Sequence, residues 1–227
     1  MIKKELIQWL KQLQSDEIED KITIMKQINQ YEIDINEFLQ CSNDFTKCIT
    51  IGIGSLDNEY LTETLKVMIQ WIEVLIEQPK IQMKCYDTVI LQFLDGLFYA
   101  LNDKISIYLS FIKEILSISH IFITRHLSQL MNTMAFHIQT HSNEIIPIIE
   151  YLLNNVDIPE LLWNECILFL YTLYHFTTQA SDDIKSKIKS LFVLLQSNYQ
   201  LLSSQYIKSY LSSLSINDND FDVFLKI

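Results

Sequence analysis

The chain contains little glycine and little proline, with three residues of each among 227. Both residues break helices and shape tight turns, so their scarcity allows long, uninterrupted helices. Hydrophobic residues make up 49% of the chain, which is enough to form one or two buried cores and argues against a disordered protein. The composition therefore predicts an all-α fold.

Arginine is almost absent as well. Arg125 is the only one, and the net charge is −11. A surface of that sign repels the phosphates of nucleic acids and of anionic membranes. Arginine is also the residue best suited to hold phosphate and guanine through paired hydrogen bonds. We therefore expect no binding to nucleic acid.

The sequence also lacks a long apolar run. No stretch reaches the 18 or more apolar residues that cross a membrane, because Asn164 and Glu165 interrupt the nearest candidate, residues 161–176. The first nine residues include two lysines and a glutamate, so they lack the continuous apolar core of a signal peptide. We expect a soluble protein with no membrane insertion.

The four cysteines do not form a CxxC pair, and each lies in an apolar or helical context. This pattern is typical of buried free thiols in a reducing compartment. It predicts a cytoplasmic or nuclear protein without disulfides. The four are Cys41, Cys48, Cys85 and Cys166.

Apolar residues recur with the period of a helix. Ile105, Leu109, Ile112 and Leu116 fall at positions i, i+4, i+7 and i+11, which places them on one face. Similar patterns and their end signals predict helices along most of the chain. The expected ranges are 2–14, 16–30, 34–50, 57–77, 80–101, 103–118, 121–140, 142–155, 158–178, 181–198 and 203–214.

Four candidate N-cap residues, Asp57, Asp103, Ser142 and Ser181, each open an expected pair of helices. They stand 46, 39 and 39 residues apart. A helix pair repeated about every 40 residues is typical of α-solenoids.

Over residues 57–214 the chain resembles the HEAT and armadillo class of helical repeats. Asp87 and the aliphatic pair 89–90 in "CYDTVILQFL" resemble the second helix of a HEAT unit, although the basic residue usual after them is missing. Pro147 in "NEIIPIIEYLL" resembles the proline that bends a HEAT first helix, and it is equally compatible with a first-turn proline. The resemblance implies an α-solenoid of antiparallel helix pairs. A closed helical bundle of the same helices is the alternative.

The same interpretation divides the chain into three parts. Residues 1–56 form less regular N-terminal helices, residues 57–214 form the repeat region, and residues 215–227 form a C-terminal tail. Because that tail is apolar to its last residue, we expect it to pack on the body of the protein or to continue into a longer chain.

No residue pattern predicts a catalytic, cofactor or metal site. Gly52 and Gly54 make the only Gly-x-Gly, and a helix stop followed by a turn to Asp57 accounts for both. His137 and His141 have metal-binding spacing, but the glutamate of a metalloprotease motif is missing between them. We expect no metal and no enzymatic activity.

The distribution of charge predicts the surface that binds a partner. Between Lys113 and Lys185, Arg125 is the only basic residue against eight acidic ones. Carboxylates without neutralising neighbours attract a basic segment of another protein, although they can also serve only solubility. The predicted partner-binding residues are Glu144, Glu150, Asp157, Glu160 and Glu165.

Aromatic residues concentrate in the same region, between positions 163 and 176, where they can form core or line a peptide-binding groove. The sequence as a whole favours a protein–protein interaction scaffold, adaptor or regulatory subunit, acting alone or within a larger complex. The alternative is a helical enzyme or small-ligand-binding protein with an internal apolar pocket.

Overall fold

The computed structural model describes residues 4–14, 18–32, 35–76, 83–101, 103–118, 120–177 and 182–216, and within these ranges it contains helices and no strand. The all-α prediction is confirmed. The helices are α1 (Lys4–Gln12), α2 (Ile18–Asn29), α3 (Ile35–Ile53), α4 (Asn58–Ile76), α5 (Met83–Tyr99), α6 (Asp103–Ile118), α7 (His120–Asn155), the 3-10 helix η1 (Glu160–Leu162), α8 (Trp163–Phe176), α9 (Asp182–Asn198) and α10 (Ser204–Ser213).

The chain divides into two compact units, Met1–Phe122 and Ile123–Ile227, which we call unit 1 and unit 2. The boundary between them lies within α7. Residue 57, where the sequence predicts the start of the repeat region, lies within unit 1, in which α3 and α4 pack against each other. Of the expected C-terminal tail, residues 217–227 lie outside the described part of the chain.

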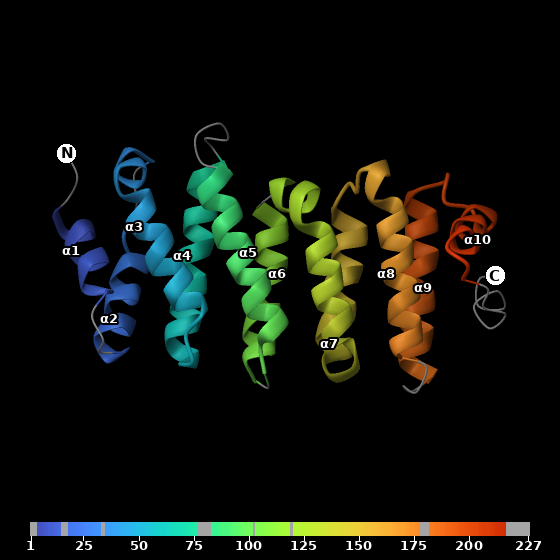
Figure 1. The fold of residues 1–227 in the computed structure, drawn as a ribbon, viewed down its shortest axis with the longest axis horizontal. Helices are drawn as coiled ribbons and strands as arrows, with labels where there is room; N and C mark the ends of the chain where they lie inside the picture. The colour runs from blue at the N-terminus through green and yellow to red at the C-terminus, as the bar shows by residue number, and fades with distance from the viewer. Residues whose placement is uncertain are drawn as a thin grey trace. The chain divides into compact units, whose positions relative to one another are not determined.

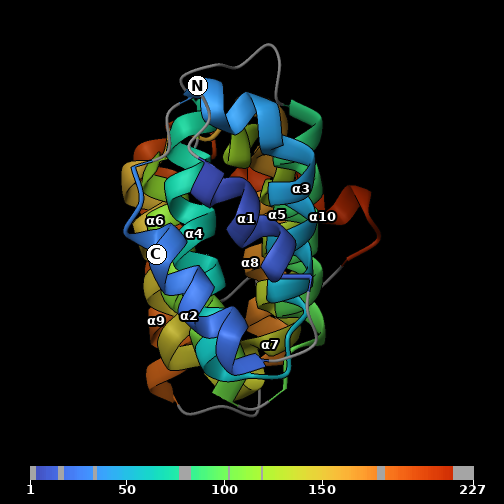
Figure 2. The ribbon, with the colours of Figure 1, turned by 90° about the vertical axis from the view of Figure 1, so that its left-hand side faces the viewer.

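In unit 1, the helices pack in the successive pairs α1–α2, α3–α4 and α5–α6, and each helix also packs against the helix two positions away. α2 packs on α4 and α4 on α6, while α1 packs on α3 and α3 on α5 (Figure 2). Lys26 Nζ lies 2.6 Å from Glu59 Oε1, and Asn29 Nδ2 donates to Glu63 Oε2 at 3.3 Å. From the first of these contacts to the second, the residue number rises in α2 and in α4, so the two helices run parallel.

The turn from α3 to α4 is fixed by the expected N-cap. Asp57 Oδ1 accepts a hydrogen bond from the Tyr60 backbone N–H at 2.8 Å, which satisfies one of the free amides of the first turn. The corresponding expectation at Asp103 is wrong by one position, since Asp103 is the first residue of α6. Ser181 lies outside the described residues.

Two glycines allow neighbouring helices to approach closely. A Cβ atom added at Gly52 would lie 2.2 Å from Thr64 Oγ1, and one added at Gly96 would lie 2.4 Å from Tyr108 Oη. The absence of a side chain at Gly96 therefore lets α5 and α6 approach closely. The role expected for Gly52 is wrong, because Gly52 lies inside α3 as a packing residue, and Gly54 alone follows the helix.

The helix pairs α3–α4 and α5–α6, which we call the two hairpins of unit 1, correspond to each other at a spacing of 44 residues. Gly96 lies 44 residues after Gly52, and Tyr108, which Gly96 approaches, lies 44 residues after Thr64, which Gly52 approaches. Buried residues correspond at the same spacing in α3 and α5 and in α4 and α6. The buried pairs are Phe45/Val89, Ile49/Phe93, Ile53/Leu97, Leu61/Ile105, Leu65/Leu109, Met68/Ile112, Trp71/Ile115 and Ile72/Leu116.

In unit 2, α7 is broken at His141, which has non-helical angles (φ −127°, ψ 31°). The break agrees with the two helices expected at 121–140 and 142–155, and Pro147 lies in the second of them. The next helix, expected from residue 158, begins later, because Pro159 precedes the 3-10 turn that leads into α8 at Trp163. Proline lacks the N–H donor, so it is accommodated at such a start.

The first segment of α7 runs parallel to α8. Ser128 Oγ donates to Glu165 Oε2, and Gln139 Nε2 donates to the Phe176 carbonyl at 3.4 Å; each pair is 37 residues apart. A constant separation along two helices requires that they run in the same direction. α8 also packs on α9 and on α10.

Two buried tyrosines of unit 1 predict a loss of stability at alkaline pH. Burial raises the pKa of Tyr60 and of Tyr108 from 10.0 to about 12. In the unfolded chain both ionise near pH 10, so the unfolded state releases protons that the folded state keeps. The free energy of unfolding is therefore unaffected by these groups below pH 10 and falls as the pH rises from 10 to 12, by about 1 kcal/mol per pH unit for each.

Denaturant unfolding at a series of pH values tests this expectation, with Tyr108→Phe as the comparison. The phenylalanine variant loses the hydrogen bond from Tyr108 Oη to the Ile53 carbonyl, so it starts less stable. It also lacks the ionisable group, so its stability declines less steeply above pH 10. Equal slopes for the two proteins would contradict the assignment.

Candidate partner-binding surface of unit 2

The five predicted partner-binding residues all lie in unit 2, on successive elements. Glu144 and Glu150 lie on the second segment of α7, and Asp157 lies in the connection after it. Glu160 begins η1, and Glu165 lies in the first turn of α8. The charge gap in the sequence therefore corresponds to carboxylates on the second segment of α7, on η1, at the start of α8 and in the connection between α7 and η1.

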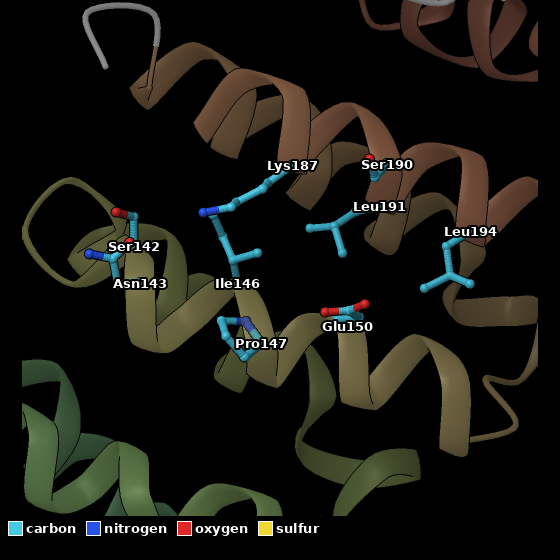
Figure 3. Close-up of a pocket in the computed structure, with 9 residues that line it drawn as sticks. All are labelled: Ser142, Asn143, Ile146, Pro147, Glu150, Lys187, Ser190, Leu191 and Leu194. Atoms are coloured by element: carbon cyan, nitrogen blue, oxygen red, sulfur yellow. The ribbon is translucent and has the colours of Figure 1, made fainter. Parts of the chain in front are cut away.

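Glu150 lies in a groove between α7 and α9, of about 300 Å³, which we call the α7–α9 groove (Figure 3). Lys187 lies on the opposite wall, but its Nζ is 2.6 Å from Asp183 Oδ2, one turn earlier on its own helix. Ile146 and Leu191 supply apolar surface between the charged groups. This groove combines a carboxylate, apolar side chains and an ammonium group that already has a partner.

Glu165 lies in a second groove, between the first segment of α7 and α8, of about 290 Å³. Its carboxylate is half-buried and accepts the hydrogen bond from Ser128, so it also helps to hold the two helices together. Leu168 and Thr172 continue along the same wall. Glu165 therefore differs from Glu150, Asp157 and Glu160, whose carboxylates are exposed.

Three of the predicted residues, Glu150, Asp157 and Glu160, are exposed and have no lysine or arginine within ion-pairing distance in the described chain. The negative charge of one of them, Asp157, also affects a neighbouring tyrosine. Burial raises the pKa of Tyr199, and the charge of Asp157 raises it further. This part of unit 2 thus carries unneutralised negative charge at its surface.

The aromatic residues of α8 divide between core and surface. Phe169 is buried, and Trp163 packs on Tyr199 with ring centroids 5.2 Å apart. Phe176, the last residue of α8, is 47% exposed, and Phe136 on α7 is 61% exposed. Most of this cluster serves packing, and Phe176 is partly exposed at the surface.

The described residues contain no group of three or more histidine, cysteine or acidic side chains arranged to hold a metal ion. The rings of His137 and His141 lie at right angles, with centroids 6.4 Å apart. Burial raises the pKa of the Cys48 thiol to about 11 and that of Cys166 to about 12. Both cysteines are therefore held in the thiol form, which is the unreactive one.

Sequence reasoning missed a third groove, in unit 1, which we call the unit 1 groove. It is lined by the α3–α4 turn, the end of α5 and the start of α6, and its volume is about 470 Å³. Leu56 and Leu101 lie in the turns beside it and are largely exposed. Large apolar residues in turns were the available signal, because turns usually carry small or polar residues.

Among the described helices, none is long and apolar enough to cross a membrane. Comparison with known proteins finds no matching family model, no matching curated protein and no matching solved structure.

Proposed function

We propose that this chain is a helical-repeat scaffold of the α-solenoid type, which binds a basic segment of a partner protein through the acidic surface of unit 2. The observation that carries the proposal is the exposure of Glu150, Asp157 and Glu160, none of which forms an ion pair with a basic residue of the described chain. A basic segment would gain attraction from these charges, and its approach would be accelerated at low salt.

The packing of unit 1 supports the repeat interpretation. In an α-solenoid, each unit contacts the next through equivalent helices that run parallel. The parallel packing of α2 on α4 and the 44-residue correspondence between the two hairpins fit that scheme. The constant separation of 37 residues between α7 and α8 fits it as well.

We further propose that the chain acts by binding, without catalysis and without a cofactor, as an adaptor or regulatory subunit of a larger complex. The three grooves lie between or beside helices. The hydroxyl–carboxylate pair in one of them, Ser128 with Glu165, links two packed helices, and the lining of that groove includes no histidine or lysine. The four cysteines are free, and three of them are buried, which fits a reducing compartment such as the cytoplasm or the nucleus.

A charge-reversal variant tests the binding surface. We expect Glu150→Lys, Asp157→Lys and Glu160→Lys together to slow association with the partner by about tenfold at low salt and to flatten its salt dependence, because exposed charges act mainly on the rate of encounter. Glu165 is left unchanged, since its hydrogen bond to Ser128 contributes to folding.

The matched control reverses three exposed carboxylates of unit 1, at Glu5, Glu19 and Glu73, and so makes the same change in net charge. Wild type and both variants serve as baits in affinity purification from the source cells. A protein retained by wild type and control is then purified, and its association rate is measured with all three. Equal rates for the unit 2 variant and the control, with unchanged thermal melts, would refute the proposal.

A further inference from the structure

Three of the most exposed large apolar side chains in the described chain line one groove. Leu56 is 90% exposed, Tyr99 is 76% exposed and Leu101 is 74% exposed, and all three border the unit 1 groove. Figure 1 shows the α3–α4 and α5–α6 turns at the same edge of unit 1. Single exposed apolar residues are common, but a cluster around a groove marks a surface that another molecule covers.

The groove is held open by buried contacts beneath it. Tyr108 Oη donates to the Ile53 carbonyl at 2.7 Å, and this links the start of α6 to the end of α3. The Tyr108 ring packs edge-on against Phe93, and Gly96 lies close against its hydroxyl end. Because Tyr108 is only 3% exposed and contacts both hairpins, the groove is already formed before any partner binds.

The charge in and around the groove favours a cation. The C-terminal ends of α3 and α5 both border it, and neither helix has a basic residue in its last turn to offset the carbonyl end of its dipole. Asp95 adds an exposed carboxylate. The one lysine in the lining, Lys104, donates from Nζ to the Ser55 carbonyl at 2.9 Å, just beyond the end of α3. Its charge offsets the field at that helix end, which leaves Asp95 and the end of α5 to attract a cation.

We propose that the unit 1 groove binds a short segment of a partner protein in which large apolar side chains flank a lysine or arginine. The apolar side chains would cover Leu56, Tyr99 and Leu101, and the cation would meet Asp95 and the end of α5. A volume of about 470 Å³ accommodates a few side chains of such a segment. A second copy of this chain is the less suitable occupant, because each copy carries a net charge of −11.

This site is separate from the acidic surface of unit 2, so the two can be tested independently. The probe is a phage-displayed library of random twelve-residue peptides, selected on the full chain at physiological salt. We expect the enriched peptides to contain two or more large apolar residues beside a lysine or arginine. Enriched peptides are then synthesised, and their dissociation constants are measured by fluorescence anisotropy.

Aspartate substitutions at Leu56 and at Leu101 should each weaken peptide binding by about tenfold or more, because they place a charge against the apolar contact. Leu201→Asp is the matched control, since Leu201 is 68% exposed and lies in the turn between α9 and α10. Asp95→Lys should weaken the original peptides and leave unchanged those in which glutamine replaces the basic residue. All four positions are exposed, so the melting temperatures should remain unchanged.

Three results would overturn the proposal. The library could yield no enriched peptide, or the peptides could bind the Leu56 and Leu101 variants as tightly as wild type. Peptides that lose binding only to the unit 2 charge-reversal variant would show that they bind the acidic surface of unit 2 and not the unit 1 groove. A dimer in sedimentation that dissociates on Leu101→Asp would assign the groove to a second copy instead.

Discussion

Replacing Gly52 or Gly96 with alanine is expected to lower the free energy of unfolding by about 1–3 kcal/mol, whereas the same change at Gly54 should have little effect. The added methyl group would lie 2.2 Å from Thr64 Oγ1 or 2.4 Å from Tyr108 Oη, well inside contact distance. At Gly54 the nearest atoms are backbone oxygens at 3.7 Å, and the position is exposed. Denaturant unfolding of the three variants provides the comparison.

The expected loss is large because neither neighbour can easily move. Thr64 is fully buried, its branched side chain is stiff, and its hydroxyl donates to the Tyr60 carbonyl at 2.7 Å. Tyr108 is fixed by its hydrogen bond to Ile53. Alanine normally favours a helix over glycine by about 1 kcal/mol, so a net loss of stability at Gly52 and Gly96 must come from the collision.

A second substitution separates the collision from other effects. In the Gly96→Ala background, Tyr108→Phe removes the nearest atom and should destabilise much less than it does in the wild-type protein. The difference is the coupling energy between the two positions. If the destabilisations by Gly96→Ala and Tyr108→Phe are additive, the two positions are not in contact as described. A stabilising effect of alanine at Gly52 or Gly96 would likewise contradict the close approach of the helices.

The helices themselves could be predicted from the sequence because local signals determine them. The apolar stripe from Ile105 to Leu116 proved to be buried in α6, and the Asp57 cap forms the expected hydrogen bond. The break at His141 agrees with the two helices expected there. These features depend on residues within a few positions of one another, so the local sequence is enough to predict them.

The candidate surfaces could be predicted only in part. The charge gap located the acidic region, but it did not distinguish the exposed Glu150 from Glu165, which is half-buried against Ser128, 37 residues earlier. The unit 1 groove depends on two turns that are brought together by the packing of α3 on α5. Which turns become neighbours is decided by contacts between distant residues, and single-residue patterns carry no record of these.

The second prediction with a large effect tests the proposed helical repeat. Deleting residues 53–96 joins Gly52 to Leu97 and removes one 44-residue unit, so each remaining position keeps its place in the repeat. We expect the shortened chain to stay helical and to unfold cooperatively, because α6 takes the place of α4 against α2 and Gly52 then faces Tyr108. Asp103 would take the position of Glu59, opposite Lys26. In a solenoid, each unit contacts only its neighbours, so loss of one unit leaves the other contacts intact.

A deletion of residues 53–94 is the matched control. It removes nearly the same length but shifts the joined helix by two residues, which rotates the rest of the chain by about 200° because a helix turns every 3.6 residues. The turn that leads to α6 then leaves the joined helix on the face opposite α2, and the apolar residues that are buried in α6 face solvent. Circular dichroism and denaturant unfolding should therefore show a folded protein for the first deletion and a largely unfolded unit 1 for the second. If both deletions abolish cooperative unfolding, the helices form one closed bundle whose core needs every member.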